Sequence, residues 1–228
     1  MNVTAGFKWI VLFSVCLAGC GQEPANPYAT APTGRVRDAN TDPYGISPNM
    51  IKFQDQLESN ATPEIDLFDL KLIDRDGQPA SLKEIANGKN LVLVMTRGYA
   101  GSICPYCSTQ VSRLIANYAE LERRNTQVVV VYPIETQADA GKSDEFVQRA
   151  VSMLATKKDL PFPILLDVEL KAVDLLGIRK DLSKPATYIL DGTGRVQFAY
   201  VSNTLADRPS VQALLEQLDK INKLAERS

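Results

Sequence analysis

Residues 90–107 read NLVLVMTRGYAGSICPYC, and this stretch decides the fold. Its first part, Asn90–Thr96, is almost entirely apolar and predicts a central strand that is covered on both faces. Its last four residues, Cys104–Cys107, read Cys-Pro-Tyr-Cys and lead into a segment, 107–124, whose apolar residues recur at helical spacing. A buried strand therefore passes through a short loop into an amphipathic helix, with two cysteines at the helix entrance.

The segments on both sides of this stretch alternate between strand and helix patterns. The strands that we expect are 66–73, 90–96, 127–132, 162–166, 186–190 and 196–202. The helices that we expect are 81–87, 107–124, 143–158, 170–176 and 208–225. Strands that alternate with helices, followed by a closing hairpin across 191–194, predict an α/β fold in the form of a three-layer α/β/α sandwich.

The N-terminus has the pattern of a processing signal. An apolar run from Trp9 to Ala18 is too short for a bilayer, because a spanning helix needs ~20 residues, but it suits the core of a signal peptide. The run ends in Leu-Ala-Gly-Cys at 17–20, which resembles the lipobox of bacterial lipoproteins. This resemblance implies cleavage before Cys20 and a lipid on that cysteine. The alternative is a buried N-terminal helix with two chance cysteines.

We therefore expect three regions: a lipoprotein signal peptide at 1–19, the lipidated Cys20 with a Pro-rich tether at 20–61, and a folded domain at 62–228. The tether lacks apolar periodicity and is rich in proline, with a short helix expected at 50–57. The mature protein would lie in the bacterial cell envelope, facing the periplasm and anchored to a membrane through its lipid. The outer membrane is slightly favoured, because Gly21 is not the Asp associated with inner-membrane retention.

The composition excludes several kinds of function. The chain has 25 Lys and Arg against 27 Asp and Glu, and this balance argues against a nucleic-acid partner. It has no histidine, which excludes His-based catalytic triads and His-ligated metals. If Cys16 leaves with the signal peptide and Cys20 carries lipid, two thiols remain. We therefore expect no metal and no cofactor other than a disulfide between Cys104 and Cys107.

The four residues Cys104–Cys107 carry the expected chemistry. At a helix entrance, the Cys104 thiolate would face unpaired backbone N–H groups and the positive end of the helix dipole, which lower a thiol pKa. Pro105 suits the first helical position, and Tyr106 is expected to tune the redox balance of the disulfide. Cys107 lies within one turn and should be the more buried thiol, suited to resolve a mixed disulfide.

Three other interpretations of the two cysteines remain open. A zinc site needs four ligands, and only two thiols are present. A purely structural disulfide is possible in an oxidising compartment, but a loop this short adds little stability. Two core cysteines are also possible, although a strand, a Cys-x-x-Cys motif and a helix in succession favour redox chemistry.

Two motifs give the chain a family resemblance. Residues 94–98 followed by Cys104–Cys107, and residues 184–194 with a proline, a strand and an Asp-x-x-Gly hairpin, are similar to the alkyl hydroperoxide reductase/thiol-specific antioxidant family of thioredoxin-fold redoxins. The resemblance covers about 62–228 and implies a thioredoxin-like sandwich with a central mixed sheet. It also implies that Pro185 is cis and lies against the active-site disulfide, and that Lys184 pairs its backbone with a substrate chain.

The sequence also departs from the peroxidases of this family. They place a Pro and a Thr or Ser before the peroxide-reactive Cys and an Arg further on. If Cys107 is aligned as that Cys, these positions hold Ala100, Cys104 and Pro185; if Cys104 is aligned, Gly101 takes the Thr position. The peroxide-activating set is thus missing or rebuilt, and Arg97 is the candidate to restore some positive charge near the thiolate.

These observations lead to three functional hypotheses. The first is a membrane-anchored thiol–disulfide oxidoreductase that exchanges electrons with protein disulfides through Cys104 and Cys107 and needs an external thiol reductant. The second is a peroxiredoxin-like peroxidase that reduces hydroperoxides. The third is a lipoprotein that keeps a redoxin fold as a binding module without enzymatic activity.

Overall fold

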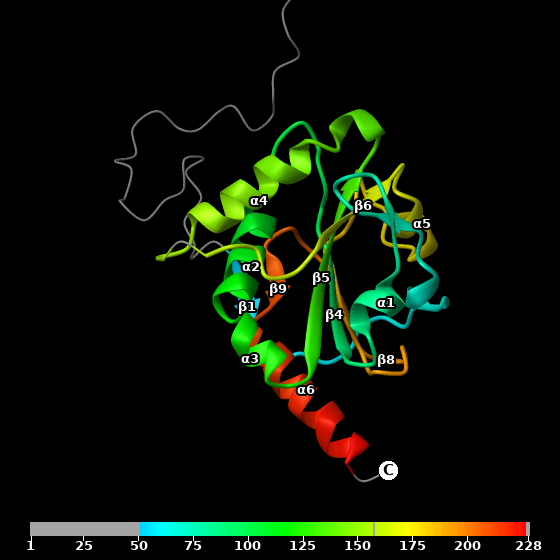
Figure 1. The fold of residues 1–228 in the computed structure, drawn as a ribbon, viewed down its shortest axis with the longest axis vertical. Coiled ribbons are helices and arrows are strands. Elements are labelled where there is room, and N and C mark those ends of the chain that lie inside the picture. Colours follow the sequence, from blue (N-terminus) through cyan, green and yellow to red (C-terminus); the bar gives the residue numbers. More distant parts are fainter. Residues whose placement is uncertain (1–50, 157, 227–228) are drawn as a thin grey trace, which may run out of the picture. The chain divides into compact units, whose positions relative to one another are not determined.

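The computed structural model describes residues 51–156 and 158–226, and a seven-stranded sheet runs through the middle of this part of the chain (Figure 1). The order of the strands in this sheet is β3-β2-β6-β5-β4-β7-β8. Their bounds are Leu72–Ile73 (β2), Pro79–Ala80 (β3), Asn90–Met95 (β4), Thr126–Ile134 (β5), Ile164–Val168 (β6), Ala186–Leu190 (β7) and Val196–Val201 (β8). Two short strands, β1 (Lys52–Gln54) and β9 (Asp207–Pro209), pair with each other in a separate parallel ladder.

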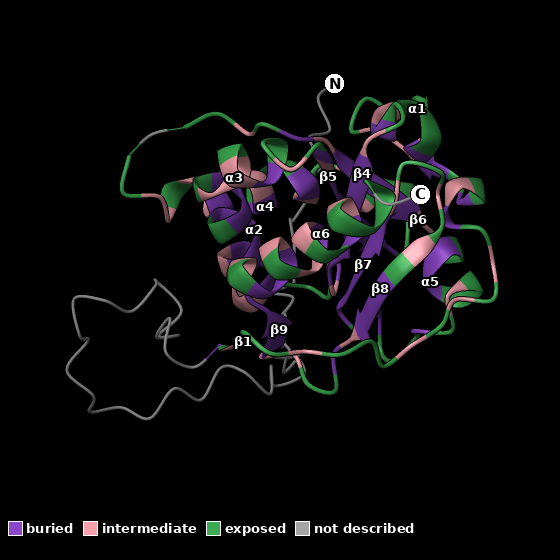
Figure 2. Cartoon of the chain, turned by 90° about the horizontal axis from the view of Figure 1, so that it is seen from below, coloured by how far each residue is buried: buried purple, intermediate pink, exposed green. Residues whose placement is uncertain are grey.

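The large sheet is mixed, as the resemblance implies. Strands β4, β5 and β6 are parallel neighbours, while β7 and β8 are added antiparallel on one side and β2 and β3 on the other. Every residue of β4 is buried, because helices cover both faces of the strand. Figure 2 shows the same burial along the neighbouring central strands.

Helices lie on both faces of the sheet and complete three layers. On one face lie α2 (Pro105–Ala116), α3 (Tyr118–Glu122), α4 (Lys142–Ser152) and α6 (Val211–Ala225), and on the other lie α1 (Leu82–Ala86) and α5 (Lys171–Leu175) (Figure 1). Each face has its own core cluster, and the cluster under α2 includes Cys104 and Cys107. The α/β class and the thioredoxin-like three-layer sandwich are therefore confirmed.

Local sequence features explain where the helices begin and end. Ser81 caps α1 because its hydroxyl accepts a hydrogen bond from the Glu84 N–H, as the capping pattern predicts. Pro105 is the first residue of α2, where its missing N–H costs nothing. The helix expected at 107–124 is interrupted at Asn117, whose side chain donates to the Arg113 carbonyl, so two helices form instead of one.

Three local predictions are wrong. Asp66 caps a short 3-10 helix at Leu67–Asp69, so the strand expected at 66–73 is reduced to β2. In the described part of 50–57, the chain forms β1 rather than a helix, because pairing with β9 satisfies its backbone. The last helix begins after the Ser210 cap, and Arg208 lies on β9.

The folded part of the chain begins before residue 62. Beyond β1, the side chain of Asn60 bonds to the backbone of Val201, and the Ser59 hydroxyl accepts the Ala199 N–H at 3.1 Å. The expected boundary between residues 61 and 62 thus lies inside packed structure. The signal peptide, Cys20 and the rest of the expected tether lie outside the described residues. Among the described helices, none combines the length and the apolarity required to cross a bilayer.

Candidate active site

Three neighbouring strands bring distant parts of the sequence to one end of the sheet. Met95, the last residue of β4, lies opposite Ala186, the first residue of β7, and Ala186 in turn lies opposite Val201, the last residue of β8. The chain leaving β4, the chain entering β7 and the chain leaving β8 therefore meet at this end. These connections carry Arg97, Pro185 and Arg208, respectively.

The connection after β4 is held tightly against β5. The Thr96 hydroxyl donates to the Val131 carbonyl at 2.9 Å, and the Tyr99 N–H donates to the Pro133 carbonyl at 3.1 Å. Gly98 lies between them at φ +89°, and a Cβ there would stand 2.3 Å from the Pro133 oxygen. Only glycine fits this approach, which fixes the path of the chain toward the dithiol.

Both cysteines are buried at the start of α2. Cys104 is the N-cap residue and is 4% exposed, while Cys107 is 0% exposed. The predicted difference in burial between the two thiols is therefore present but small. Both thiols are free in this structure. Pro105 and Tyr106 lie between them, half-buried at the mouth of the site, and Tyr106 packs against the core cluster that includes the dithiol.

Two donors approach the Cys107 sulfur. The backbone N–H of Arg97 donates to Cys107 Sγ at 3.4 Å, and Nη2 of Arg208 donates to the same sulfur at 3.6 Å. The Arg208 side chain is 1% exposed. Its Nη1 donates to the Asp207 carbonyl at 2.7 Å and, at 3.5 Å, to the Thr204 carbonyl and the Ser202 hydroxyl.

Arg208 is a buried cation whose other partners are neutral oxygens. Within 51–156 and 158–226 it forms no ion pair with a carboxylate, and its Nε has no hydrogen-bond partner. A buried charge without a counter-ion is costly, so the site favours a negative charge on the sulfur beside it. This geometry makes Cys107 the thiol that ionises first.

The two sulfurs share one proton unequally. The hydrogen bond from Cys104 lowers the pKa of Cys107 to about 6, against the opposing effect of burial, with Arg208 and the Arg97 N–H lowering it further. The hydrogen bond to Cys107 and burial raise the pKa of Cys104 above its ordinary value. This order of acidity is the opposite of the one expected from the helix N-terminus, which favours Cys104. The backbone N–H of Cys107 does lower the pKa of Cys104, but the other two effects outweigh it.

The connection into β7 reaches the site in a different way from the one implied by the family resemblance. The Lys184–Pro185 peptide is trans, as are all the peptide bonds of the described residues, so the expected cis proline is wrong. Ser183 donates its N–H to the Arg97 carbonyl at 3.3 Å, which ties this loop to the chain after β4. Pro185 is buried and accepts the Ser202 N–H at 2.8 Å. The extended trans chain thus enters β7 directly, and trans is the intrinsically favoured form.

Both backbone groups of Lys184 form hydrogen bonds within the protein. Its N–H donates to the Ile178 carbonyl at 2.8 Å, and its carbonyl accepts the Ser183 hydroxyl at 2.8 Å. The N–H is therefore not free to pair with a substrate chain, while the carbonyl keeps a second lone pair. The exposed Lys184 ammonium is the group that this residue presents to solvent. Arg97 is half-buried, and its backbone rather than its guanidinium meets the sulfur.

Sequence reasoning missed two residues of this site. Arg208 was placed at the start of the last helix, and nothing in its local pattern links it to a cysteine 101 positions earlier. Tyr132 is fully buried in the same core cluster and stacks on Phe146 with ring centroids 4.8 Å apart. Burial raises the pKa of Tyr132, and negative charge on Cys107 raises it further, so its hydroxyl stays protonated.

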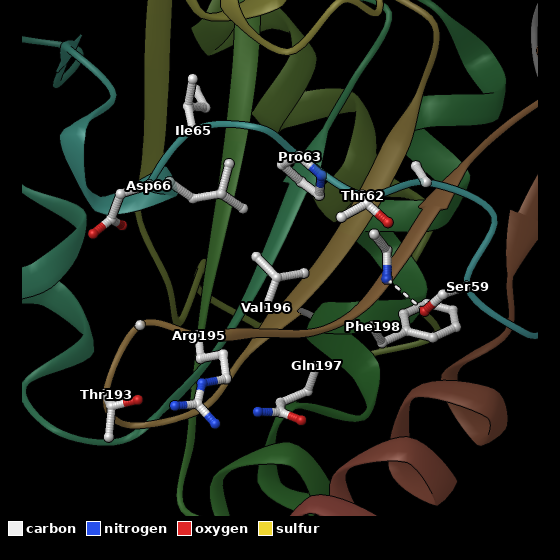
Figure 3. Close-up of a pocket in the computed structure, with 14 residues that line it drawn as sticks. Ser59, Thr62, Pro63, Ile65, Asp66, Thr193, Arg195, Val196, Gln197 and Phe198 are labelled. Carbon is white, nitrogen blue, oxygen red and sulfur yellow. Dashed lines mark hydrogen bonds between the residues drawn. The ribbon is translucent and has the colours of Figure 1, made fainter.

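A surface pocket lies elsewhere on the sheet. Its volume is about 600 Å³, and it is formed between the segment 59–67 and the outer edge of β8 (Figure 3). Figure 3 shows Arg195, Gln197 and Asp66 among its lining side chains, and neither cysteine contributes to it. Because the dithiol takes no part in this pocket, the pocket is a separate feature of the β8 edge.

Comparisons with known proteins find one curated relative in sequence and several solved structures of similar fold. Over 125 residues, the chain is 26% identical to the thiol-disulfide oxidoreductase ResA of Halalkalibacterium halodurans, a match that covers 55% of this chain and 60% of that relative. Its fold is similar to a peroxiredoxin 6 variant of Arenicola marina, with a TM-score of 0.59 and 15% identity over 73% of this chain and 76% of that one. A yeast mitochondrial 1-Cys peroxiredoxin gives a TM-score of 0.59 and 14% identity over 75% of this chain and 79% of that one.

The family is shown by a match over most of the described chain. A model of the AhpC/TSA family matches residues 59–199, which include both cysteines and Pro185 but end before Arg208. The expected family is thereby confirmed, together with its thioredoxin-type fold. This chain, with its dithiol at the start of α2, belongs to the AhpC/TSA family.

Proposed function

We propose that this protein is a thiol–disulfide oxidoreductase that exchanges electrons with partner disulfides through Cys104 and Cys107. One observation carries the proposal: the paired thiols lie at the start of α2, and a buried guanidinium and a backbone N–H both donate to the Cys107 sulfur. These donors favour a thiolate in the reduced protein at neutral pH. The similarity to a thiol-disulfide oxidoreductase supports the same reaction class.

The geometry suggests how the two thiols divide the reaction. Cys104 is the less buried thiol and attacks a partner disulfide after passing its proton to the Cys107 thiolate. This step forms a mixed disulfide on Cys104 and releases one partner thiolate. Cys107 then gives its proton to the released partner thiolate and attacks the Cys104 sulfur, which releases the second partner sulfur as a thiolate and leaves the Cys104–Cys107 disulfide. Two electrons pass to the partner, and an external thiol reductant must restore them.

We also propose that the protein acts in the bacterial cell envelope, held to a membrane by lipid on Cys20. The support is the order of the N-terminal sequence, a short apolar run that ends in Leu-Ala-Gly-Cys. The mature protein should fractionate with membranes and partition into detergent, and Cys20→Ala should release it or block its processing. A wholly soluble wild-type protein that retains Met1 would exclude the anchor.

A peroxidase is the second candidate, and Arg208 is the observation that favours it. The sequence lacks the usual arginine of the family's peroxidases, but the structure supplies a guanidinium to Cys107 from β9. The Cys107 thiolate would attack a hydroperoxide, leaving a sulfenic acid on Cys107 and releasing the alcohol or water. Cys104 would then displace water from that sulfenic acid and form the disulfide. Against this, both cysteine residues are at least 96% buried, and Cys104 takes the place of the usual Thr.

One set of assays separates the candidates. We expect wild-type protein to accelerate the reduction of insulin disulfides by a small thiol, Cys104→Ser to abolish the acceleration, and Cys107→Ser to accumulate a mixed disulfide on Cys104. Stopped-flow oxidation of the reduced protein by hydrogen peroxide should be slower than oxidation by a disulfide, because one missing oriented donor typically costs 10²–10³ in rate. A faster reaction with peroxide would give the peroxidase first place. Inactivity of wild type in both assays would favour a binding module.

A further inference from the structure

The two short strands outside the main sheet form a ladder next to the dithiol. In the parallel pairing of β1 and β9, Phe53 lies opposite Arg208. The ladder is closed at both ends, because the Lys52 N–H donates to the Ala206 carbonyl and the Ser210 N–H donates to the Gln54 carbonyl, each at 2.9 Å. Both strands lie outside the residues matched by the family model. The backbone that carries Arg208 is thus held by a strand at the other end of the described chain.

Side chains of β1 and β8 strengthen this ladder. The Gln54 amide donates to the Asp207 carboxylate and, at 3.3 Å, to the Tyr200 hydroxyl. The Tyr200 hydroxyl donates to the other oxygen of Asp207 at 2.7 Å. Asp207 is 7% exposed and is therefore satisfied by these neighbours rather than by solvent alone. Gln54 thus fixes the residue that precedes Arg208.

Phe53 connects the same strand to the helix that carries the cysteines. The Arg113 guanidinium lies over the Phe53 ring, with Cζ 4.0 Å from the ring centroid, within the range of a cation–π interaction. Arg113 is on α2, the helix that begins beside Cys104 and contains Cys107. Strand β1 therefore contacts both β9, which supplies the guanidinium, and α2, which supplies the thiol.

Arg208 depends on such support from outside its own loop. The oxygen atoms that bind its Nη1 all belong to residues 202–207, so they move with the loop and do not fix it against α2. The bond from Nη2 to Cys107 spans 3.6 Å, so a shift of β9 away from α2 would lengthen and weaken it.

We propose that β1 is part of the redox centre: by holding β9 and α2 together, Phe53 and Gln54 position Arg208 beside Cys107 and keep that thiol ionised in the reduced protein. They are positioning residues, because neither touches a sulfur. The proposal rests on thiol–disulfide exchange as the protein's function, since a thiolate at Cys107 matters for that reaction. Without its supporting strand, Arg208 would face the sulfur from a longer and more variable distance.

The test measures the thiolate itself in the full-length reduced protein. In Phe53→Ala, the pKa of Cys107, followed by thiolate absorbance near 240 nm, should rise by about one pH unit, because an opposite charge nearby typically changes a pKa by ~1–3 units. The equilibrium with glutathione at pH 7 should then shift several-fold toward the disulfide, since the reduced form loses stabilisation. Gln54→Leu should shift the pKa of Cys107 and the equilibrium with glutathione in the same direction. Phe53→Tyr keeps the ring, so both values should stay at those of the wild-type protein.

Two controls keep the proposal falsifiable. Phe68→Ala removes a comparably half-buried ring that packs against the other core cluster, and it should leave both quantities unchanged even if it lowers stability. Equal shifts in Phe68→Ala and Phe53→Ala would mean a general loosening and would overturn the proposal. An unchanged pKa of Cys107 and an unchanged glutathione equilibrium in Phe53→Ala and Gln54→Leu would also overturn it.

If Phe53→Ala does not fold, the result for Gln54→Leu tests the proposal by itself. Because neither readout requires a partner protein, failure of insulin reduction would count against the proposed function and not against this positioning.

Discussion

Two loops end beside the dithiol, and they contribute different groups to the site. The loop before β7 ties its backbone to the chain after β4, buries Pro185 and leaves the Lys184 ammonium in solvent. The loop after β8 brings the buried Arg208 guanidinium to the Cys107 sulfur. One loop therefore places an exposed cation near the site, and the other places a buried cation at the sulfur. The difference teaches that the charge at the surface and the charge at the sulfur can be changed separately.

The largest change in the pKa of Cys107 should come from removing the guanidinium that the loop after β8 supplies. Arg208→Leu removes the guanidinium, so the pKa of Cys107 should rise from about 6 toward its ordinary value of 9.0, by ~1–3 pH units. The thiolate fraction at pH 7 would fall from about nine-tenths to between about one-half and about one-hundredth, as measured by thiolate absorbance against pH. Arg97→Leu is the matched control, because that residue meets the sulfur through its backbone N–H. An equal rise in the control would show that overall positive charge, not the Arg208 contact, is responsible.

The same charge should make the stability of the reduced protein depend on pH. The folded state holds the pKa of Cys107 below its ordinary value, so this thiol stabilises the fold fully above pH 9 and loses that contribution as the pH falls through about 6. The pKa of Cys104 is raised, so that thiol lowers stability above pH 9. The free energy of unfolding should therefore rise by roughly 2–4 kcal/mol between pH 6 and pH 9 and decline beyond.

Urea denaturation at a series of pH values would measure this profile. The oxidised protein has no thiols to titrate at this site, and Cys107→Ser lacks the acidic one, so both should give nearly flat profiles over the same range. A reduced wild-type protein whose stability does not change between pH 6 and pH 9 would contradict the unequal sharing of the proton.

A smaller effect is expected on the first loop. Because the Lys184 N–H is already bonded within the protein, the exposed ammonium is the main group that this residue offers to a partner. Lys184→Glu should slow exchange with an acidic peptide disulfide several-fold at low salt and much less at high salt, where exposed charges are screened. The pKa of Cys107 should stay the same. Stopped-flow exchange with matched acidic and basic peptides would measure this, and an equal slowing of both peptides would point to a change of shape instead.

The smallest effect should come from Pro185→Ala. The bond before this proline is trans, so alanine can adopt the same backbone, and the stability change should stay within about 1 kcal/mol. The acidity of Cys107 should not change. Denaturant titration of the reduced variant measures the change in stability, and thiolate absorbance against pH measures the pKa of Cys107. A loss of several kcal/mol would indicate that the buried ring itself supports the dithiol.

The two loops also differ in how far the sequence predicts them. The apolar run of β4, the capping box of α1 and the Cys-Pro start of α2 are local patterns, and the structure has each of them. Their short-range causes, burial and capping, can be inferred from a window of a few residues. The motif also predicts the proline of the first loop, but the cis geometry that the family resemblance implies is wrong.

The contribution of Arg208 has no such local cause. The apolar spacing of α6 predicts a helix that begins at residue 208, whereas Ser210 is the N-cap and the helix begins at Val211. The residue's conformation is set by pairing with 52–54, more than 150 positions away in the chain, in a region whose prolines and lack of periodicity suggested a tether. A contact of this kind depends on strand pairing across the whole domain and not on composition nearby.

The shared proton of the dithiol has a consequence for the direction of electron flow. Between pH 6 and the raised pKa of Cys104, reducing the disulfide takes up two electrons but only one proton, so the reduction potential should change by ~30 mV per pH unit. A partner dithiol that takes up two protons changes by ~59 mV per pH unit. Each unit of acidification should therefore shift the equilibrium about tenfold toward this protein as the electron donor, and each unit of alkalinity should favour it as the acceptor.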